Sequence, residues 1–113
     1  MTHKEIAQAF SNGKFEVTFP YLADNIEWIV AGREHFKGRE KVIDNCTKTA
    51  EYFKTVTTDF KINNIIEENQ IVVINGTAEF LKDEKRLAFI SACDVYEFNS
   101  SNKLEKITSY CIE

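Results

Sequence analysis

The sequence predicts an α+β fold in which three N-terminal helices pack on a strongly curved, mainly antiparallel β-sheet. Two observations carry this prediction. Apolar residues recur mostly at helical spacing in the first half of the chain, and they alternate with polar residues from Thr58 onward. The connections between the later strands are too short to hold a crossover helix, so consecutive strands must pair antiparallel. Helices followed by a run of strands are typical of an α+β domain.

Three helices are predicted in the first half of the chain. Thr2 and Glu5 have the spacing of a capping box, and Gly13 ends the helix that they begin. A short helix is predicted over residues 15–22 from the spacing of its large apolar side chains. The clearest amphipathic pattern covers Arg39–Phe53 and predicts the longest helix.

Five strands are predicted around and after the long helix. Residues 25–31 alternate in polarity and are followed by a polar loop over residues 32–38. A bulge is expected near Asn63, and Gly76 predicts a bend or bulge in its strand. The last four strands are expected to form a meander over residues 58–66, 71–81, 87–98 and 104–112.

The composition excludes several classes of protein. The 113 residues include 14 basic and 18 acidic side chains, for a formal net charge of −4, and 43% are hydrophobic. This balance excludes a disordered chain and a basic nucleic-acid-binding module. The length suits a single domain over residues 1–113. No uninterrupted apolar run is longer than four residues, as in residues 71–74, which is far too short to span a bilayer.

Cysteine and histidine spacing argues against a metal site. The three cysteines form no C-x-x-C pair, and the two histidines lie far apart. Unpaired thiols predict a cytoplasmic location. The sequence has no phosphate-binding or dinucleotide-binding motif, so no cofactor is expected.

Asp94 is the first candidate functional residue because it lies in the middle of an otherwise apolar strand. Alternation places it on one face with Ile90, Ala92 and Tyr96. An inward carboxylate is costly unless it is paired, hydrogen-bonded or protonated. Burial raises a carboxyl pKa, and a neutral acid can donate a hydrogen bond to a developing oxyanion. The alternative is an acid that only accepts hydrogen bonds in the pocket wall.

Seven further side chains are candidates for the same site, and two of them, Ile90 and Ala92, are expected to line the ligand pocket beside Asp94. Tyr96 points to the same side as the acid, as a catalytic donor or a structural partner. Trp28 and Val30 share a face of their strand and could form a flat ligand-binding wall. Tyr110, on the last strand, could join the network. His35 precedes the long helix and is either a base at the cleft mouth or an inert surface residue.

The order of elements resembles the nuclear-transport-factor-2-like superfamily, and within it the SnoaL-like group. The matching stretches are Gly13-Lys14-Phe15-Glu16 with residues 22–28, residues 36–40, Asp94-Val95-Tyr96-Glu97-Phe98 and Lys103-Leu104-Glu105-Lys106-Ile107. The resemblance implies a cone-shaped sheet with an apolar pocket at its open end and dimers formed through the outer sheet face. Members include ketosteroid isomerase, polyketide cyclases, limonene epoxide hydrolase and binding domains, so architecture alone assigns no reaction.

The resemblance also indicates what is missing. Asp94 falls where ketosteroid isomerase carries its oxyanion-stabilising aspartic acid. The general base of that enzyme would lie near Val30, and its helix tyrosine near Ile6, where this sequence has aliphatic residues. The arginine of the epoxide hydrolases would fall at Ala92. Neither reaction is therefore expected.

Three functions remain open from the sequence. The first is binding of a small hydrophobic, carbonyl-bearing ligand in the cone pocket. The second is catalysis by an isomerase, cyclase or hydrolase in which Asp94 is the acid or oxyanion donor and Tyr96 a second donor. The third is a non-catalytic dimeric protein-interaction scaffold. Residues 71–74 are apolar on both sides of their strand, and the outer side needs a partner surface, which predicts a homodimer.

Overall fold

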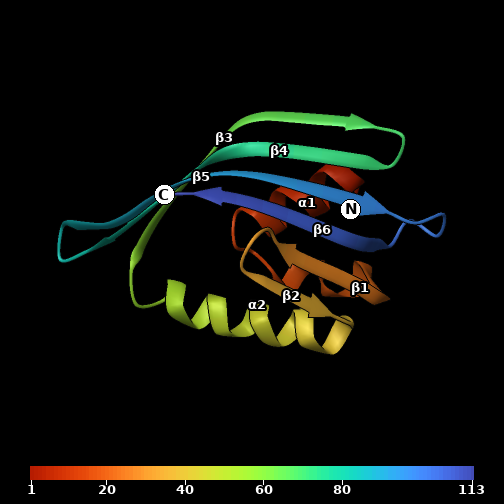
Figure 1. Ribbon diagram of the computed structural model, residues 1–113, viewed down its shortest axis with the longest axis horizontal. Coiled ribbons are helices and arrows are strands. Elements are labelled where there is room, and N and C mark those ends of the chain that lie inside the picture. Colours follow the sequence, from red (N-terminus) through yellow and green to blue (C-terminus); the bar gives the residue numbers. More distant parts are fainter.

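One curved six-stranded sheet, with helices packed against one of its faces, makes up the structure (Figure 1). The computed structural model describes residues 1–113. In chain order the elements are α1 (His3–Ser11), the 3₁₀ helix η1 (Glu16–Tyr21), β1 (Leu22–Val30), β2 (Glu34–Lys37), α2 (Arg39–Phe53), β3 (Thr57–Glu68), β4 (Ile71–Lys82), β5 (Lys85–Phe98) and β6 (Leu104–Ile112). The predicted α+β class is confirmed.

The sheet has the strand order β2-β1-β6-β5-β4-β3. All neighbouring strands pair antiparallel except β1 and β6, which are parallel. The parallel pair arises because the chain leaves β1, passes through α2 to the far edge of the sheet and returns strand by strand. In Figure 1, α1 lies behind β5 and β6, and α2 runs below β1 and β2. The hairpin between β4 and β5 projects beyond the body of the molecule.

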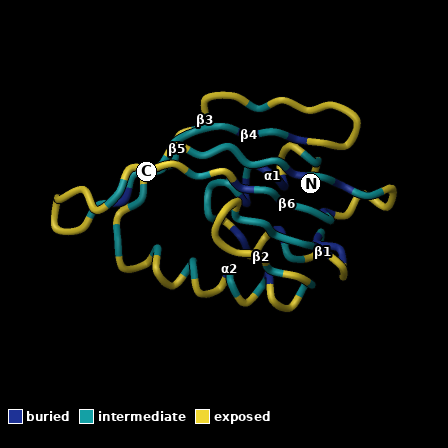
Figure 2. Tube along the Cα trace, in the orientation of Figure 1, coloured by how far each residue is buried: buried dark blue, intermediate teal, exposed yellow.

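The hydrophobic core lies between the helices and the inner face of the sheet. Its side chains come from every layer, with Phe10 from α1, Val42 and Cys46 from α2, and Ile74 and Tyr96 from the sheet. Figure 2 shows the buried segments gathered on this side and the exposed ones at turns and along the outside of α2. The capping box is present, because Thr2 accepts from the Glu5 amide and the Glu5 carboxylate accepts from the Thr2 amide.

Two expected elements differ in the structure. The short helix predicted over residues 15–22 is a 3₁₀ helix over residues 16–21 that contains Pro20, and Leu22 already belongs to β1. Residues 34–37, expected to be loop, form the edge strand β2. This strand pairs with β1, and its Phe36 lies opposite Trp28, so an aromatic cross-strand pair stabilises a segment whose composition is polar.

The sheet bends at a bulge in β3, as the sequence predicted. The register with β4 shifts between Ile62 and Asn64, and Gly76 lies opposite Ile62 at this point. A Cβ atom at Gly76 would collide with the carbonyl oxygen of Lys61. The missing side chain therefore lets the two backbones approach closely where the sheet curves around the core.

No helix of the structure combines the length and apolar character needed to cross a membrane.

Candidate functional site

A cavity of about 190 Å³ lies between the helices and the inner face of the sheet. We call it the inner cavity. Aromatic and aliphatic side chains make up most of its wall, and its polar side chains are Ser11, Asp94 and Ser109. The remaining lining residues are Phe10, Gly13, Phe15, Trp28, Val30, Phe53, Ala78, Phe80, Ile90, Ala92 and Cys111. The structure thus brings together five predicted site residues, namely Trp28, Val30, Ile90, Ala92 and Asp94.

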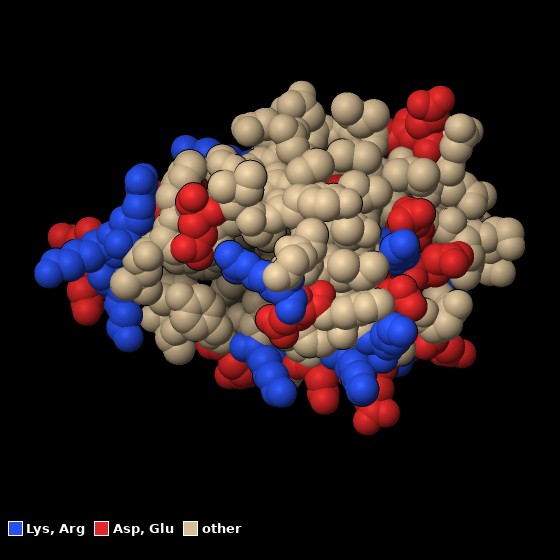
Figure 3. Space-filling view, in the orientation of Figure 1, with Lys and Arg blue, Asp and Glu red and all other residues tan.

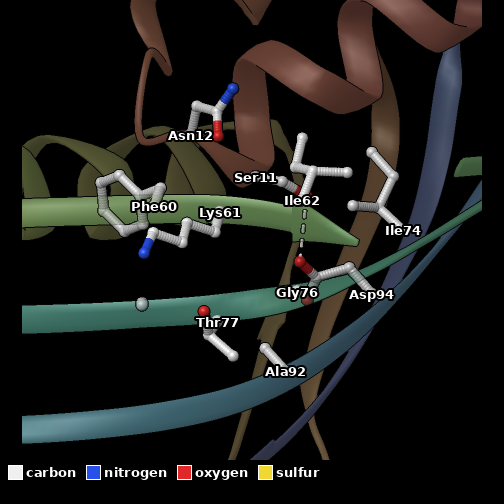
Figure 4. A pocket seen from close by; sticks show the side chains of 11 residues that line it. Ser11, Asn12, Phe60, Lys61, Ile62, Ile74, Gly76, Thr77, Ala92 and Asp94 are labelled. Atoms are coloured by element: carbon white, nitrogen blue, oxygen red, sulfur yellow. Dashed lines mark hydrogen bonds between the residues drawn. The ribbon is translucent and has the colours of Figure 1, made fainter. Parts of the chain in front are cut away.

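A second, smaller cavity of about 70 Å³ adjoins the inner cavity and shares Ser11 and Asp94 with it. Figure 4 shows the Asp94 carboxylate reaching from β5 toward Ser11 at the end of α1, with Ile62 and Ile74 beside them. The acid therefore stands at the junction of two spaces.

Asp94 is the centre of a hydrogen-bonded network that ties α1 to the sheet. The Ser11 Oγ donates to Asp94 Oδ2 at 3.0 Å and lies 2.5 Å from the hydroxyl of Tyr96. Because the single proton of Ser11 goes to the carboxylate, Tyr96 is the donor in the second bond. Tyr96 thus acts on the acid through Ser11, and its own side chain is fully buried.

A second arm of the network comes from β1 and β6. Ser109 lies directly opposite Asp94 in the sheet. The indole Nε1 of Trp28 donates to the Ser109 Oγ at 3.1 Å. An indole nitrogen can only donate, so the Ser109 proton is free to hydrogen-bond Asp94. Ser11 thus donates to the carboxylate and Tyr96 donates to Ser11, while the Ser109 hydroxyl contributes a further hydrogen bond to Asp94.

Burial dominates the ionisation of the acid. Desolvation raises the pKa of Asp94 above its ordinary value, although the hydrogen-bonding side chains of Ser109, Ser11 and Tyr96 act to lower it. Burial, together with the neighbouring Asp94, also raises the pKa of Tyr96 well above its usual range, so the phenol keeps its proton. The site thus pairs an acid that is shifted toward its neutral form with neutral donors.

Two predicted site residues lie elsewhere. Tyr110 is opposite Cys93 on the outer face of the sheet and is 51% exposed, so the expectation that it joins the Asp94 network is wrong. The reason is a register irregularity where Phe98 and Leu104 pair, which reverses the alternation along β6. As a result Ile107 and Ser109 face inward instead of Tyr110.

His35 is also outside the inner cavity. It lies on β2 opposite Ile29, on the face of the sheet that Trp28 does not share. Its Nε2 is 3.4 Å from a carboxylate oxygen of Glu27, and its side chain is 41% exposed. His35 is therefore a surface residue, one of the two alternatives from the sequence, and it does not line the cavity, so it supplies no base there.

Three polar contributors were not predicted from the sequence. Ser11 ends the first helix one turn after the buried Ala7, so helical periodicity was the signal that places it inward. Ser109 follows Ile107 by two residues, but only the observed register shows which face they share. Cys111 is half-buried in the cavity wall, where burial raises the pKa of its thiol and disfavours the nucleophilic thiolate.

The arrangement can hold one polar atom of a ligand against Asp94 while the rest packs on aromatic walls. Val30, where the resemblance would place a general base, contributes only hydrocarbon to the cavity. The described side chains contain no group of three or more His, Cys, Asp and Glu residues that could hold a metal ion. Among the protein groups lining the cavity, Asp94 is the only carboxylic acid.

The fold and site define a cone-shaped α+β protein with a buried acid in its inner cavity. The family model described as a SnoaL-like domain matches residues 4–109, and the chain belongs to this family. This confirms the resemblance seen in the sequence.

Solved structures agree with this assignment. An NTF2-like protein of unknown function from Cytophaga hutchinsonii ATCC 33406 is 37% identical, with a TM-score of 0.87 over 97% of this chain and 96% of the other. A second such protein from the same organism is 15% identical, with a TM-score of 0.69 over 99% and 91%. An LEH-like epoxide hydrolase of M. tuberculosis shares the fold at 18% identity, with a TM-score of 0.74 over 97% and 82%. No protein among the curated sequences matches the chain.

Proposed function

We propose that this protein binds a small hydrophobic, carbonyl-bearing molecule in the inner cavity. The observation that carries the proposal is the single buried acid facing a mostly apolar cavity. In its neutral form Asp94 donates a hydrogen bond to the carbonyl oxygen of the ligand. The carboxyl group of Asp94 lines the inner cavity, where the oxygen of a ligand can accept its proton.

The volume of the inner cavity limits the size of the ligand. About 190 Å³ is smaller than the roughly 300–1,000 Å³ typical of sites for drug-sized ligands. The aromatic wall, with Phe10 and Trp28 packed edge to face at 5.0 Å between ring centroids, favours a flat ligand. A molecule with one ring and one carbonyl group matches both features.

Catalysis is the second candidate function, and the raised pKa of Asp94 is the observation that favours it. A buried acid that retains its proton can protonate a ligand oxygen or stabilise an oxyanion, as an isomerase, cyclase or hydrolase requires. Ser11 and Tyr96 would position and polarise the acid in this role. No protein base other than Asp94 itself lines the cavity, so the acid step is the one that these residues supply.

Ligand binding can be measured by the fluorescence of Trp28, the only tryptophan in the chain and a cavity-lining residue. Acetophenone is expected to change this fluorescence and to bind more tightly than ethylbenzene, which has nearly the same shape without the carbonyl oxygen. The Asp94→Ala variant should bind acetophenone about tenfold more weakly, the loss of one hydrogen bond. The exposed Asp44→Ala on α2 is the matched control. Equal affinities for acetophenone and ethylbenzene would refute the role of the acid.

We further propose a homodimer that forms through the outer face of the sheet. Figure 3 shows a broad expanse of uncharged side chains over β3 to β6, while charged side chains gather along α2 and at the projecting hairpin. Ile66, Ile71, Phe89, Tyr110 and Ile112 are large apolar residues that are exposed here. Such a surface supports self-association, because a second copy covers it without bringing like charges together. The same dimer would serve a non-catalytic scaffold, the third candidate function.

The dimer has a direct test. The protein is expected to sediment as a dimer at micromolar concentration, and Tyr110→Asp should convert it to a monomer by placing a charge in the interface. Val17→Asp is the control, since Val17 is equally exposed at 52% but belongs to η1. A wild-type protein that sediments as a monomer contradicts the proposal.

The cysteines bear on where in the cell the protein works. All three cysteines are unpaired in the structure. We place the protein in a reducing cytoplasm on this basis. We also propose that it works without cofactor, metal, nucleic acid or membrane.

A further inference from the structure

The inner cavity has a larger neighbour on the other side of the loop that follows α1. A groove of about 610 Å³ runs between η1 and α2, and we call it the outer groove. Its apolar wall includes Phe15, Phe19, Cys46 and Ala50. Only Gly13 and Phe15 belong to the lining of both the outer groove and the inner cavity. The two spaces therefore meet at these residues.

Phe15 is the side chain that separates them. Its ring is buried, with 6% exposed, and packs edge to face on Phe10 at 5.0 Å between centroids. It also stacks on Phe53 at 6.1 Å and lies tilted against Trp28 at 6.4 Å. Gly13 has no side chain, so the ring of Phe15 is the only side chain of the shared wall.

The backbone holds this ring in place. The carbonyl oxygen of Phe15 accepts hydrogen bonds from both the amide and the hydroxyl of Thr18. Thr18 is fully buried. Movement of the partition would thus need rotation of the Phe15 side chain, since its backbone is bonded into η1.

We propose that Phe15 determines ligand size in this protein by closing the inner cavity toward the outer groove. The inference rests on the proposed function, in that Asp94 binds the polar end of the ligand. With the ring in place, the inner cavity does not continue into the outer groove. Without it, a longer ligand keeps its carbonyl group at Asp94 and extends an apolar tail along Phe19 and Ala50.

The experiment compares acetophenone with 4-acetylbiphenyl, which adds one ring to the same carbonyl head. Wild-type protein is expected to bind acetophenone more tightly, as measured by Trp28 fluorescence. Phe15→Ala, and the milder Phe15→Leu, should raise the affinity for 4-acetylbiphenyl about tenfold or more. Phe19→Ala is the matched control, because Phe19 lines the outer groove but not the inner cavity. This variant should still bind acetophenone more tightly than 4-acetylbiphenyl.

A measurement without ligand tests the partition itself. Opening the wall should increase quenching of Trp28 by acrylamide severalfold in both Phe15 variants and leave it unchanged in Phe19→Ala. Folded Phe15 variants with wild-type quenching and wild-type size preference would overturn the inference. If wild-type protein fails to respond to acetophenone while the Phe15 variants show faster quenching, the proposed function falls and the partition stands.

Discussion

Replacing Gly76 by alanine is expected to lower the free energy of unfolding by about 3 kcal/mol, the upper end of the usual cost of overpacking. The added methyl group would collide with the Lys61 carbonyl oxygen and lie 3.1 Å from the Ile62 Cα. These are backbone atoms, which cannot rotate away as a side chain can. β3 must therefore separate from β4 at the bulge that curves the sheet. Urea unfolding followed by circular dichroism measures the loss.

Gly32→Ala separates this steric effect from the general cost of replacing glycine. No atom would lie within 4 Å of a Cβ atom at Gly32, although its φ of +76° is left-handed. The expected cost there is about 1 kcal/mol, from the backbone conformation alone. If Gly76→Ala is no less stable than Gly32→Ala, the close approach of β3 and β4 is not what requires glycine.

Asp94→Asn is expected to make the protein more stable than wild type at neutral pH, by a margin that disappears in acid. Burial raises the pKa of Asp94 in the folded state, whereas the pKa of an aspartate in the unfolded chain is about 3.9. Between these two values the folded state binds a proton that the unfolded state releases. The stability that the acid contributes is thus complete below the unfolded pKa and is lost as the pH rises through the raised folded pKa.

The asparagine variant is uncharged at every pH and lacks this loss. Each unit by which the folded pKa is raised corresponds to a stability difference of about 1.4 kcal/mol at high pH. Urea unfolding of both proteins across a pH series measures the difference, and Asp44→Asn, which removes an exposed charge from α2, is the control. A wild-type protein that gains stability relative to Asp94→Asn with rising pH would show that the hydrogen bonds from Ser11 and Ser109 outweigh burial.

Much of the site could be predicted because β5 alternates without a bulge between Ile90 and Asp94. Strict alternation placed Asp94 on one face with Ile90 and Ala92, and all three line the inner cavity. The same reasoning placed Trp28 and Val30 together on β1. In these stretches neighbouring side chains alternate without interruption, so the face of each residue follows from its position in the chain.

The misassigned residues lie where a register shift interrupts the alternation of a strand, or where pairing with another strand gives a polar segment β structure. Counting by twos from the buried Leu104 places Tyr110 inward, but the register shift beside Leu104 reverses the faces before Ile107. His35 was expected in a loop because its surroundings are polar. Pairing with β1 makes that segment a strand and directs the histidine toward Glu27 on the outer face.

By itself, the sequence determined the fold class, most of the elements and the strand face that carries Asp94. These follow from periodicity, caps and turns, which act between residues a few positions apart. Only the tertiary structure decided that Ser11 bonds an acid 83 positions away, that Ser109 faces inward and that Phe15 stands between two spaces. Such contacts depend on strand register and on helix packing, and these are set by how distant segments fill one core.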